Sequence, residues 1–274
     1  MSIKFLLLLV LFLSISCMAR ATNYCANGQL GGGWKFDETS GTLSDCTGNA
    51  NTATGHNVTE GVAGKYGNAV SFGNNNNDYV SASASATLNT LSTVSMGAWI
   101  YPNSMGKTGN ICTGSDIIAK SDSSHGPELC LNSSGTISFV ANWSGGRVVW
   151  TTSSAVVSTS SWQHVAVTYS YSSTSNTPKI YYNGASQSIT SGSPFGSQGS
   201  DSGNGLSVGN ETSGGGVAGG FDGVIDEPFW GNVVFSSTDI SNIMTYGIDG
   251  TENSTPVTTF TTINDAVINH ATIN

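Results

Sequence analysis

Charged side chains are scarce in this chain of 274 residues: they make up 9% of it, where roughly a quarter is usual. Lys and Arg number 8 against 17 Asp and Glu, giving a formal net charge of −9. So few cations cannot form the basic stripe that neutralises phosphates, which excludes a nucleic-acid-binding protein. The Ser-, Thr-, Asn- and Gly-rich composition also excludes a coiled coil, and 38% hydrophobic residues argue against disorder.

Long hydrophobic runs are missing as well. The longest, residues 5–13, is too short for a membrane-spanning helix, which needs about 20 apolar residues. It follows Lys4 and precedes the small-x-small site at 19–21, so residues 1–21 are predicted to be a signal peptide and the mature protein to be secreted. A lipid anchor at Cys17 is the alternative.

Cysteines are few, and none has C-x-x-C spacing or a nearby His, so a metal site at the cysteines is not favoured. Four cysteines remain after the signal peptide, an even number that fits an oxidising compartment and allows three pairings. Their order along the chain favours two local disulfides, Cys25–Cys46 and Cys112–Cys130. Each would close a loop of about 20 residues, worth about 3 kcal/mol in the chain-entropy model.

Short stretches of alternating apolar residues, separated by Gly, Asn, Ser and Pro, recur from Gly31 to Gly247 and predict an all-β fold. The clearest are 94–100, 137–143, 163–169 and 224–230, together with 179–182, which Asn183-Gly184 follows as a strong hairpin signal. One helix is predicted over 238–246, capped by Ser236 or Ser237 and ended by Gly247. No βαβ alternation occurs, which excludes a parallel sheet.

The domain organisation follows from these patterns. Residues 22–250 are predicted to form one sandwich domain. Residues 251–274 are rich in Thr, Asn and Ile and are predicted to be a poorly ordered tail, with a stalk or an extra strand as alternatives.

Six segments, taken in order, resemble the laminin G-like (LamG-like) domain of the concanavalin A-like lectin/glucanase superfamily over about residues 31–247. They are 34–41 (WKFDETSG), 64–72 (GKYGNAVSF), 96–102 (MGAWIYP), 162–166 (WQHVA), 182–184 (YNG) and 221–227 (FDGVIDE). The resemblance implies a two-sheet antiparallel jelly-roll β-sandwich and, in many relatives, a structural calcium ion. It also implies a glycan-binding or adhesive role, although a fold does not fix a function.

The acidic residues near the end of the domain do not form a catalytic set. Glucanases of this superfold carry acids at alternate positions of one strand, whereas here those positions hold Asp222, Val224 and Asp226. Val224 interrupts the pattern and Glu227 is expected on the opposite face. The chain is therefore predicted not to be an enzyme, and a divergent glycoside hydrolase is the third alternative. His164, alone in an apolar strand, is predicted to be a packed structural residue.

The acidic residues fit a calcium site better than a catalytic site, because calcium takes six to eight oxygen ligands. The resemblance places Asp37, after the first strand, beside Asp226 in the last, and Asn68 could add a carbonyl oxygen. These three residues are the predicted calcium ligands. The alternative is that Asp37 starts a turn and Asp226 accepts backbone hydrogen bonds.

Glycan recognition needs aromatic surfaces next to polar groups. Trp143 and Trp150 flank the predicted hairpin tip that carries Arg147, so these three residues are the predicted ligand site; burial of the indoles in the sandwich is the alternative.

The stretch after Glu227 is apolar on both faces and contains Pro228, which places it at an edge or a bulge. It is either buried on both sides or an exposed patch near Phe229 through which a structural or adhesive protein would bind a surface protein or itself. Two functions therefore stand: a secreted lectin-like module that binds an extracellular glycan with calcium, and such an adhesive protein.

Overall fold

The computed structural model describes residues 21–75, 77–106, 112, 115–120, 126–190, 192–211 and 220–253. Residues 1–20 of the predicted signal peptide, with Cys17, and residues 254–274 of the predicted tail lie outside this range, so those assignments stay predictions. Within the described part of the chain, no helix is long and apolar enough to cross a membrane.

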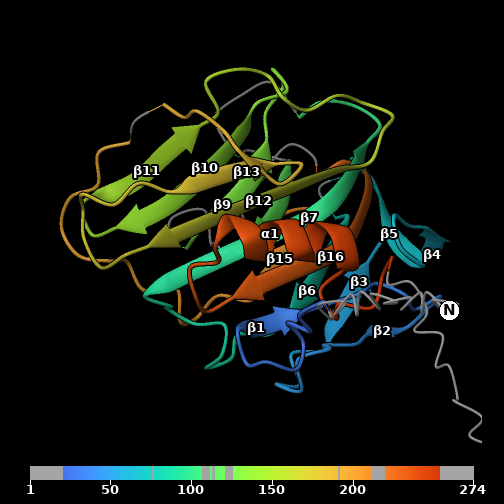
Figure 1. The fold of residues 1–274 in the computed structure, drawn as a ribbon. Helices are drawn as coiled ribbons and strands as arrows, with labels where there is room; N and C mark the ends of the chain where they lie inside the picture. The colour runs from blue at the N-terminus through green and yellow to red at the C-terminus, as the bar shows by residue number, and fades with distance from the viewer. Residues whose placement is uncertain are drawn as a thin grey trace, which may run out of the picture.

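The described residues form two antiparallel sheets of eight strands each (Figure 1), which confirms the predicted all-β sandwich. Sheet 1 has the order β14-β13-β12-β7-β16-β5-β4, and β1 also pairs with β16. Its strands are β1 (Leu30–Gly33), β4 (Thr59–Ala63), β5 (Asn68–Gly73), β7 (Thr93–Pro102), β12 (Gln163–Ser170), β13 (Lys179–Tyr182), β14 (Ala185–Ser186) and β16 (Asp222–Gly231).

Sheet 2 has the order β11-β10-β9-β8-β15-β6-β3-β2. Its strands are β2 (Thr42–Leu43), β3 (Ala53–His56), β6 (Tyr79–Ala82), β8 (Asp116–Ala119), β9 (Glu128–Leu131), β10 (Ile137–Trp143), β11 (Gly146–Thr151) and β15 (Leu206–Val208). The strand predicted at 137–143 coincides with β10, and the Asn183-Gly184 turn joins β13 to β14 with both residues at positive φ, as a two-residue hairpin loop requires.

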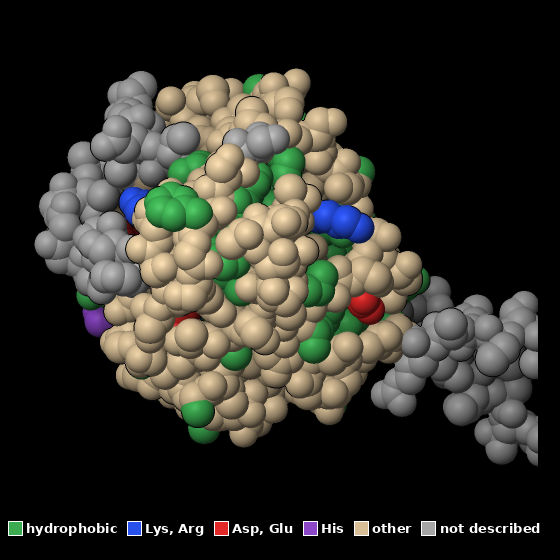
Figure 2. Space-filling model, turned by 90° about the vertical axis from the view of Figure 1, so that its left-hand side faces the viewer, with side chains coloured by type: hydrophobic (Ala, Val, Ile, Leu, Met, Phe, Trp, Pro, Cys, Tyr) green, Lys and Arg blue, Asp and Glu red, His purple; other side chains and the backbone are tan. Residues whose placement is uncertain are grey.

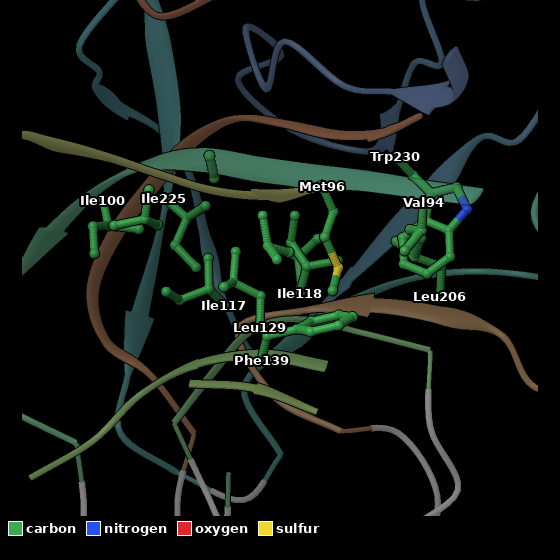
Figure 3. Packing of buried hydrophobic residues seen from close by; sticks show 14 of the residues in the cluster. Val94, Met96, Ile100, Ile117, Ile118, Leu129, Phe139, Leu206, Ile225 and Trp230 are labelled. Carbon is green, nitrogen blue, oxygen red and sulfur yellow. The ribbon is translucent and has the colours of Figure 1, made fainter. Parts of the chain in front are cut away.

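The main core lies between the sheets and is built from the alternate apolar residues of both. Figure 3 shows Val94, Met96 and Ile100 of β7, with Ile225 and Trp230 of β16, meeting side chains from sheet 2. Those partners are Ile117, Ile118, Leu129, Phe139 and Leu206. Because successive strand residues point to opposite faces, the other residues of each strand face outward.

The helix α1 (Ser237–Tyr246) lies across the outer face of sheet 1, over β7, β12 and β16 (Figure 1). Ile240 and Ile243 of α1 pack there with Phe229 and Phe235 in a second buried cluster. Ser236 caps the helix and Gly247 ends it, as predicted. Sheet 1 is therefore buried on both faces beneath α1.

The strand near Phe229 is not an exposed edge. Between Asp226 and Phe229 the register of β16 against β7 shifts, so Pro228 stands at a bulge in an interior strand. Phe229 is fully buried because α1 covers it, which selects burial on both sides over an exposed patch. The predicted self-association surface at this edge is wrong.

Both predicted disulfides are present, Cys25–Cys46 and Cys112–Cys130. The first joins the segment before β1 to the segment after β2. The second lies on the outer face of sheet 2, where Cys130 of β9 points away from the main core.

Candidate functional site

The predicted ligand site at Trp143, Arg147 and Trp150 does not form. Trp150 pairs with Phe139 across β10 and β11, and both rings point into the main core; Trp143, in phase with Phe139, is 5% exposed and Trp150 0%. Arg147 points outward and binds Glu128 through its guanidinium. The indoles serve packing because they share the inward phase of their strands.

With both indoles buried, the surface at this end of the sandwich is mostly polar and uncharged. Figure 2, which views the molecule from the β11 side, shows mostly backbone and side chains that are neither charged nor hydrophobic, with apolar side chains in several places. One large exposed hydrophobic residue, Phe195, lies over Gly145 in the β10–β11 turn.

An aromatic groove opens instead on the outer face of sheet 2, over β3, β6 and the start of β15. This depression has a volume of about 290 Å³ and is lined by His56, Tyr79, Ser81, Ala82, Ser83, Ala84 and Gly205. We call it the aromatic groove. The polar side-chain groups of its described lining are hydroxyls and an imidazole, with no carboxylate among them.

Strand register builds the wall of the aromatic groove. His56, the last residue of β3, pairs directly with Tyr79, the first of β6, so both side chains stand on one face. Their rings stack with centroids 4.3 Å apart at 23°, and His56 Nε2 lies 3.0 Å from Ser81 Oγ. Nothing in the sequence set His56 apart, because β3 is a four-residue strand that contains a Gly and has no clear alternation.

The structure brings the three predicted calcium ligands to one rim of sheet 1. The Asn68 backbone N–H donates to Asp37 Oδ1 (3.0 Å), and its side-chain amide donates to the Asp37 carbonyl oxygen (2.8 Å). The Tyr66 N–H donates to Asp226 Oδ2 (2.9 Å). Asp37 and Asp226 therefore hold the two sides of the β4–β5 turn, and Lys35 Nζ lies 3.4 Å from Asp37 Oδ2.

Oxygen atoms converge on Gly64 in this turn. A Cβ atom at Gly64 would lie 2.5 Å from the Tyr66 carbonyl oxygen, 2.6 Å from that of Asn68 and 2.8 Å from Asp226 Oδ2. Asp226 is fully buried, and its Oδ1 has no hydrogen-bond partner within the described part of the chain. Burial raises the pKa of Asp226 to about 7. We call this group of oxygens the rim site.

Glu227 lies near the rim site rather than across the sheet from it. It has a positive φ of 52° at the β16 bulge, and its Oε2 accepts the Ile248 N–H (2.7 Å). Burial raises the pKa of Glu227, and the neighbouring Asp226 raises it further. The expectation that Glu227 points to the opposite face assumed regular alternation, which the bulge interrupts.

Two antiparallel sheets packed face to face define a jelly-roll β-sandwich. The sequence model of the Concanavalin A-like lectin/glucanases superfamily (laminin G type) matches residues 73–241. This is more than half of the chain, which therefore belongs to that superfamily. No curated protein matches the chain.

Solved structures share the fold at low sequence identity. Domain 4 of AbnA, a GH43 extracellular arabinanase from Geobacillus stearothermophilus, solved with arabinotriose, has a TM-score of 0.53 and 18% identity over 79% of this chain and 98% of its own. The binding domain of Paraclostridial Mosquitocidal Protein 1 gives 0.58 and 13%, covering 79% of this chain and 52% of that one.

The ligand-binding domain of botulinum neurotoxin serotype D, solved with N-acetylneuraminic acid, gives a TM-score of 0.55 and 15% identity over 80% of this chain and 51% of that one. The chain thus spans about half the length of the two toxin domains. The two toxin structures are described as binding domains, and domain 4 of AbnA was solved in complex with arabinotriose.

Proposed function

We propose that this protein is a secreted, non-catalytic glycan-binding module whose aromatic groove takes the sugar. The stacked His56–Tyr79 pair carries the proposal, because sugars present apolar C–H faces that pack on aromatic rings. The hydroxyls of Ser81 and Ser83 in the same groove would bind the sugar hydroxyls. The arabinotriose and N-acetylneuraminic acid named with two structural neighbours support this class of ligand, and the two disulfides support an extracellular location.

The charge distribution favours a neutral glycan. Among the described residues, the lining of the aromatic groove contains no Lys or Arg, and the chain carries a net charge of −9. Acidic sugars need a cationic partner and would be repelled by the overall field.

The test is a glycan array followed by titration calorimetry with the best neutral glycan. Tyr79→Ala should weaken binding about tenfold or more, which corresponds to about 1.4 kcal/mol for a lost aromatic contact. Tyr101→Ala is the matched control, because Tyr101 is a half-buried tyrosine on sheet 1 that packs edge-to-face against Trp162. Equal affinities for the two variants, or no binding of the wild type to any glycan, would contradict the proposal.

The same proposal includes a structural calcium ion at the rim site. The oxygens that surround the Gly64 position, together with the unpaired Asp226 Oδ1, are the donors that calcium prefers, at distances of about 2.3–2.6 Å. Asp226 and the carbonyls of Tyr66 and Asn68 would hold the ion, and Asp37 would position the turn through its hydrogen bonds to Asn68. The ion would offset the buried charge of Asp226.

Calorimetry with calcium should therefore show a binding event that Asp226→Asn removes and Asp222→Asn, four residues earlier in β16, retains. Because burial raises the pKa of Asp226 to about 7, calcium must displace a proton below that pH. Affinity should then fall about tenfold per pH unit as the pH drops from 7 to 5. An Asp226→Asn isotherm equal to that of the wild type would show that no calcium binds at the rim site.

A further inference from the structure

A pocket opens on the outer face of sheet 1, beside the segment that leads into α1. It has a volume of about 350 Å³ and is larger than the aromatic groove. Val234 and Phe235 form its apolar wall. Most of the remaining lining is polar and consists of Thr168, Ser170, Ser175, Asn176, Thr177 and Lys179. We call it the β12–β13 pocket.

Strand register sets the width of the β12–β13 pocket. Thr168 of β12 pairs with Lys179 of β13 on one side and with Ser95 of β7 on the other. Each of these residues is adjacent in sequence to a core residue, so all stand on the outer face. Ser95 Oγ donates to the Val233 carbonyl oxygen (2.7 Å) and accepts the Phe235 N–H (3.0 Å), which holds the apolar wall over β7. The wall and Lys179 are therefore two strand spacings apart, about 10 Å, which leaves room for one sugar ring.

Hydrogen bonds fix both sides of the pocket. On the loop between β12 and β13, the Asn176 side-chain amide donates to the Ser170 carbonyl oxygen and to Ser172 Oγ, both at 3.0 Å. On the side of the apolar wall, Thr93 Oγ1 donates to the Asn232 carbonyl oxygen (2.7 Å). A pocket whose sides are already fixed binds a small ligand with little ordering cost.

The polar groups of this pocket are largely unpaired. Lys179 is exposed, and its ammonium makes no ion pair or hydrogen bond with the described residues. Within the same part of the chain, the side-chain hydroxyls of Ser175 and Thr177 have no hydrogen-bond partner either. The described lining includes no carboxylate. The pocket therefore offers one unpaired cation next to hydroxyl and amide groups.

We propose that the β12–β13 pocket binds an acidic monosaccharide, a sugar that carries a carboxylate. The carboxylate would pair with the Lys179 ammonium, and the sugar hydroxyls would bond to Asn176 and Thr177. Val234 is 49% exposed, and its side chain would pack against the apolar C–H face of the ring. The volume lies at the lower end of the range of small-molecule sites, which suits a single sugar. This second site does not depend on the aromatic groove, which is proposed to take a neutral glycan.

The net charge of −9 opposes the binding of any anion at low salt. At about 0.15 M salt, charges farther away than about 8 Å are largely screened. A carboxylate in contact with Lys179 lies well within that distance. Binding should therefore be measured at about this ionic strength.

The experiment titrates the isotope-labelled full chain with sodium glucuronate and follows its backbone amide signals by NMR. Glucose, which lacks the carboxylate, and sodium acetate, which lacks the sugar, are titrated separately. Glucuronate should shift the signals of residues 175–179 and bind about fivefold or more tightly than either. Lys179→Ala should weaken glucuronate binding about fivefold, because it removes an exposed ion pair and should leave the fold intact.

Two control variants locate the site. Lys65→Ala removes the same charge from the β4–β5 turn and should leave glucuronate affinity unchanged. Tyr79→Ala should also leave it unchanged, so failure of the aromatic groove and failure of this pocket are distinguishable. The proposal is overturned if glucuronate does not bind, if glucose or acetate binds as tightly, or if Lys179→Ala binds glucuronate as the wild type does. Loss of glucuronate binding in Tyr79→Ala would place the acidic sugar in the aromatic groove and would also overturn it.

Discussion

His164 shows at the scale of a single residue how burial sets a side chain's chemistry. It is 1% exposed, packs edge-on against Trp99 and parallel to Phe229, and neither ring nitrogen has a hydrogen-bond partner among the described residues. Burial lowers the pKa of His164 to about 3. The imidazole therefore stays neutral at all ordinary pH values and acts as a flat packing residue, which confirms the prediction from sequence.

The pH dependence of the free energy of unfolding should show that His164 stays neutral in the folded protein. Below about pH 6.5 the unfolded chain protonates His164 while the folded one does not, so His164 costs stability as the pH falls toward 3. His164→Phe should therefore stabilise the protein more at about pH 4.5 than at pH 8, by up to about 3 kcal/mol. Urea unfolding at both pH values measures this difference, and an equal effect at both would show that the folded state protonates His164 as readily as the unfolded one.

At the same scale, the polar sites were only partly predictable. Asp37, Asn68 and Asp226 were identified through motifs that carry a family pattern, and the structure brings them together around one turn. The aromatic groove was not found, because His56 and Tyr79 are 23 positions apart in the sequence and meet only through the β3–β6 register. For Trp150, local sequence shows an aromatic residue beside a hairpin tip, but only the pairing with Phe139 shows that it points inward.

At the scale of elements, α1 is defined by its first turn. Ser236 Oγ accepts the Asp239 N–H (3.2 Å), and the Asp239 carboxylate accepts the Ser236 N–H (2.9 Å), a reciprocal capping box. The helix covers the outer face of sheet 1 through Ile240 and Ile243. Fraying of its first turn would expose Phe235 and the cluster beneath it.

Ser236→Ala should lower the free energy of unfolding by about 1 kcal/mol, because it leaves the Asp239 N–H without its acceptor. Ser241→Ala is the control: Ser241 is exposed within the same helix, and alanine there should change stability by less than about 0.5 kcal/mol. Guanidinium unfolding of both variants measures the two changes in the free energy of unfolding. Equal effects would mean that packing alone holds the helix in place.

Elements with a strong periodic pattern were predictable, and the shortest were not. The strands β7, β10, β12 and β13 were predicted with boundaries close to those observed, since each alternates over several residues or meets a specific turn. By contrast, β2 and β14 have two residues each, too few to show a period. In β4 a shift of register between Glu60 and Val62 breaks the alternation, so these strands depend on neighbours supplied from elsewhere in the chain.

At the scale of the whole molecule, the two-sheet sandwich was predictable from the sequence. Which of its two outer faces the helix covers was not. Composition and short alternating strands indicate two facing sheets. Which outer face is covered depends on where α1 packs, and this is decided by contacts between residues as distant as Tyr24 and Phe235. The helix α1 covers the outer face of sheet 1, the aromatic groove lies on sheet 2, and the rim site lies at the β4–β5 turn.

The two ends of the described domain meet at one point. The Tyr24 and Cys25 N–H groups both donate to the Ile248 carbonyl oxygen (2.9 and 3.2 Å), and the backbone of Thr22 lies against Gly250. Tension applied through both ends would load this small contact before it reaches the hydrogen-bond ladders of the sheets. The two ends of the domain would therefore separate from each other before either sheet is deformed.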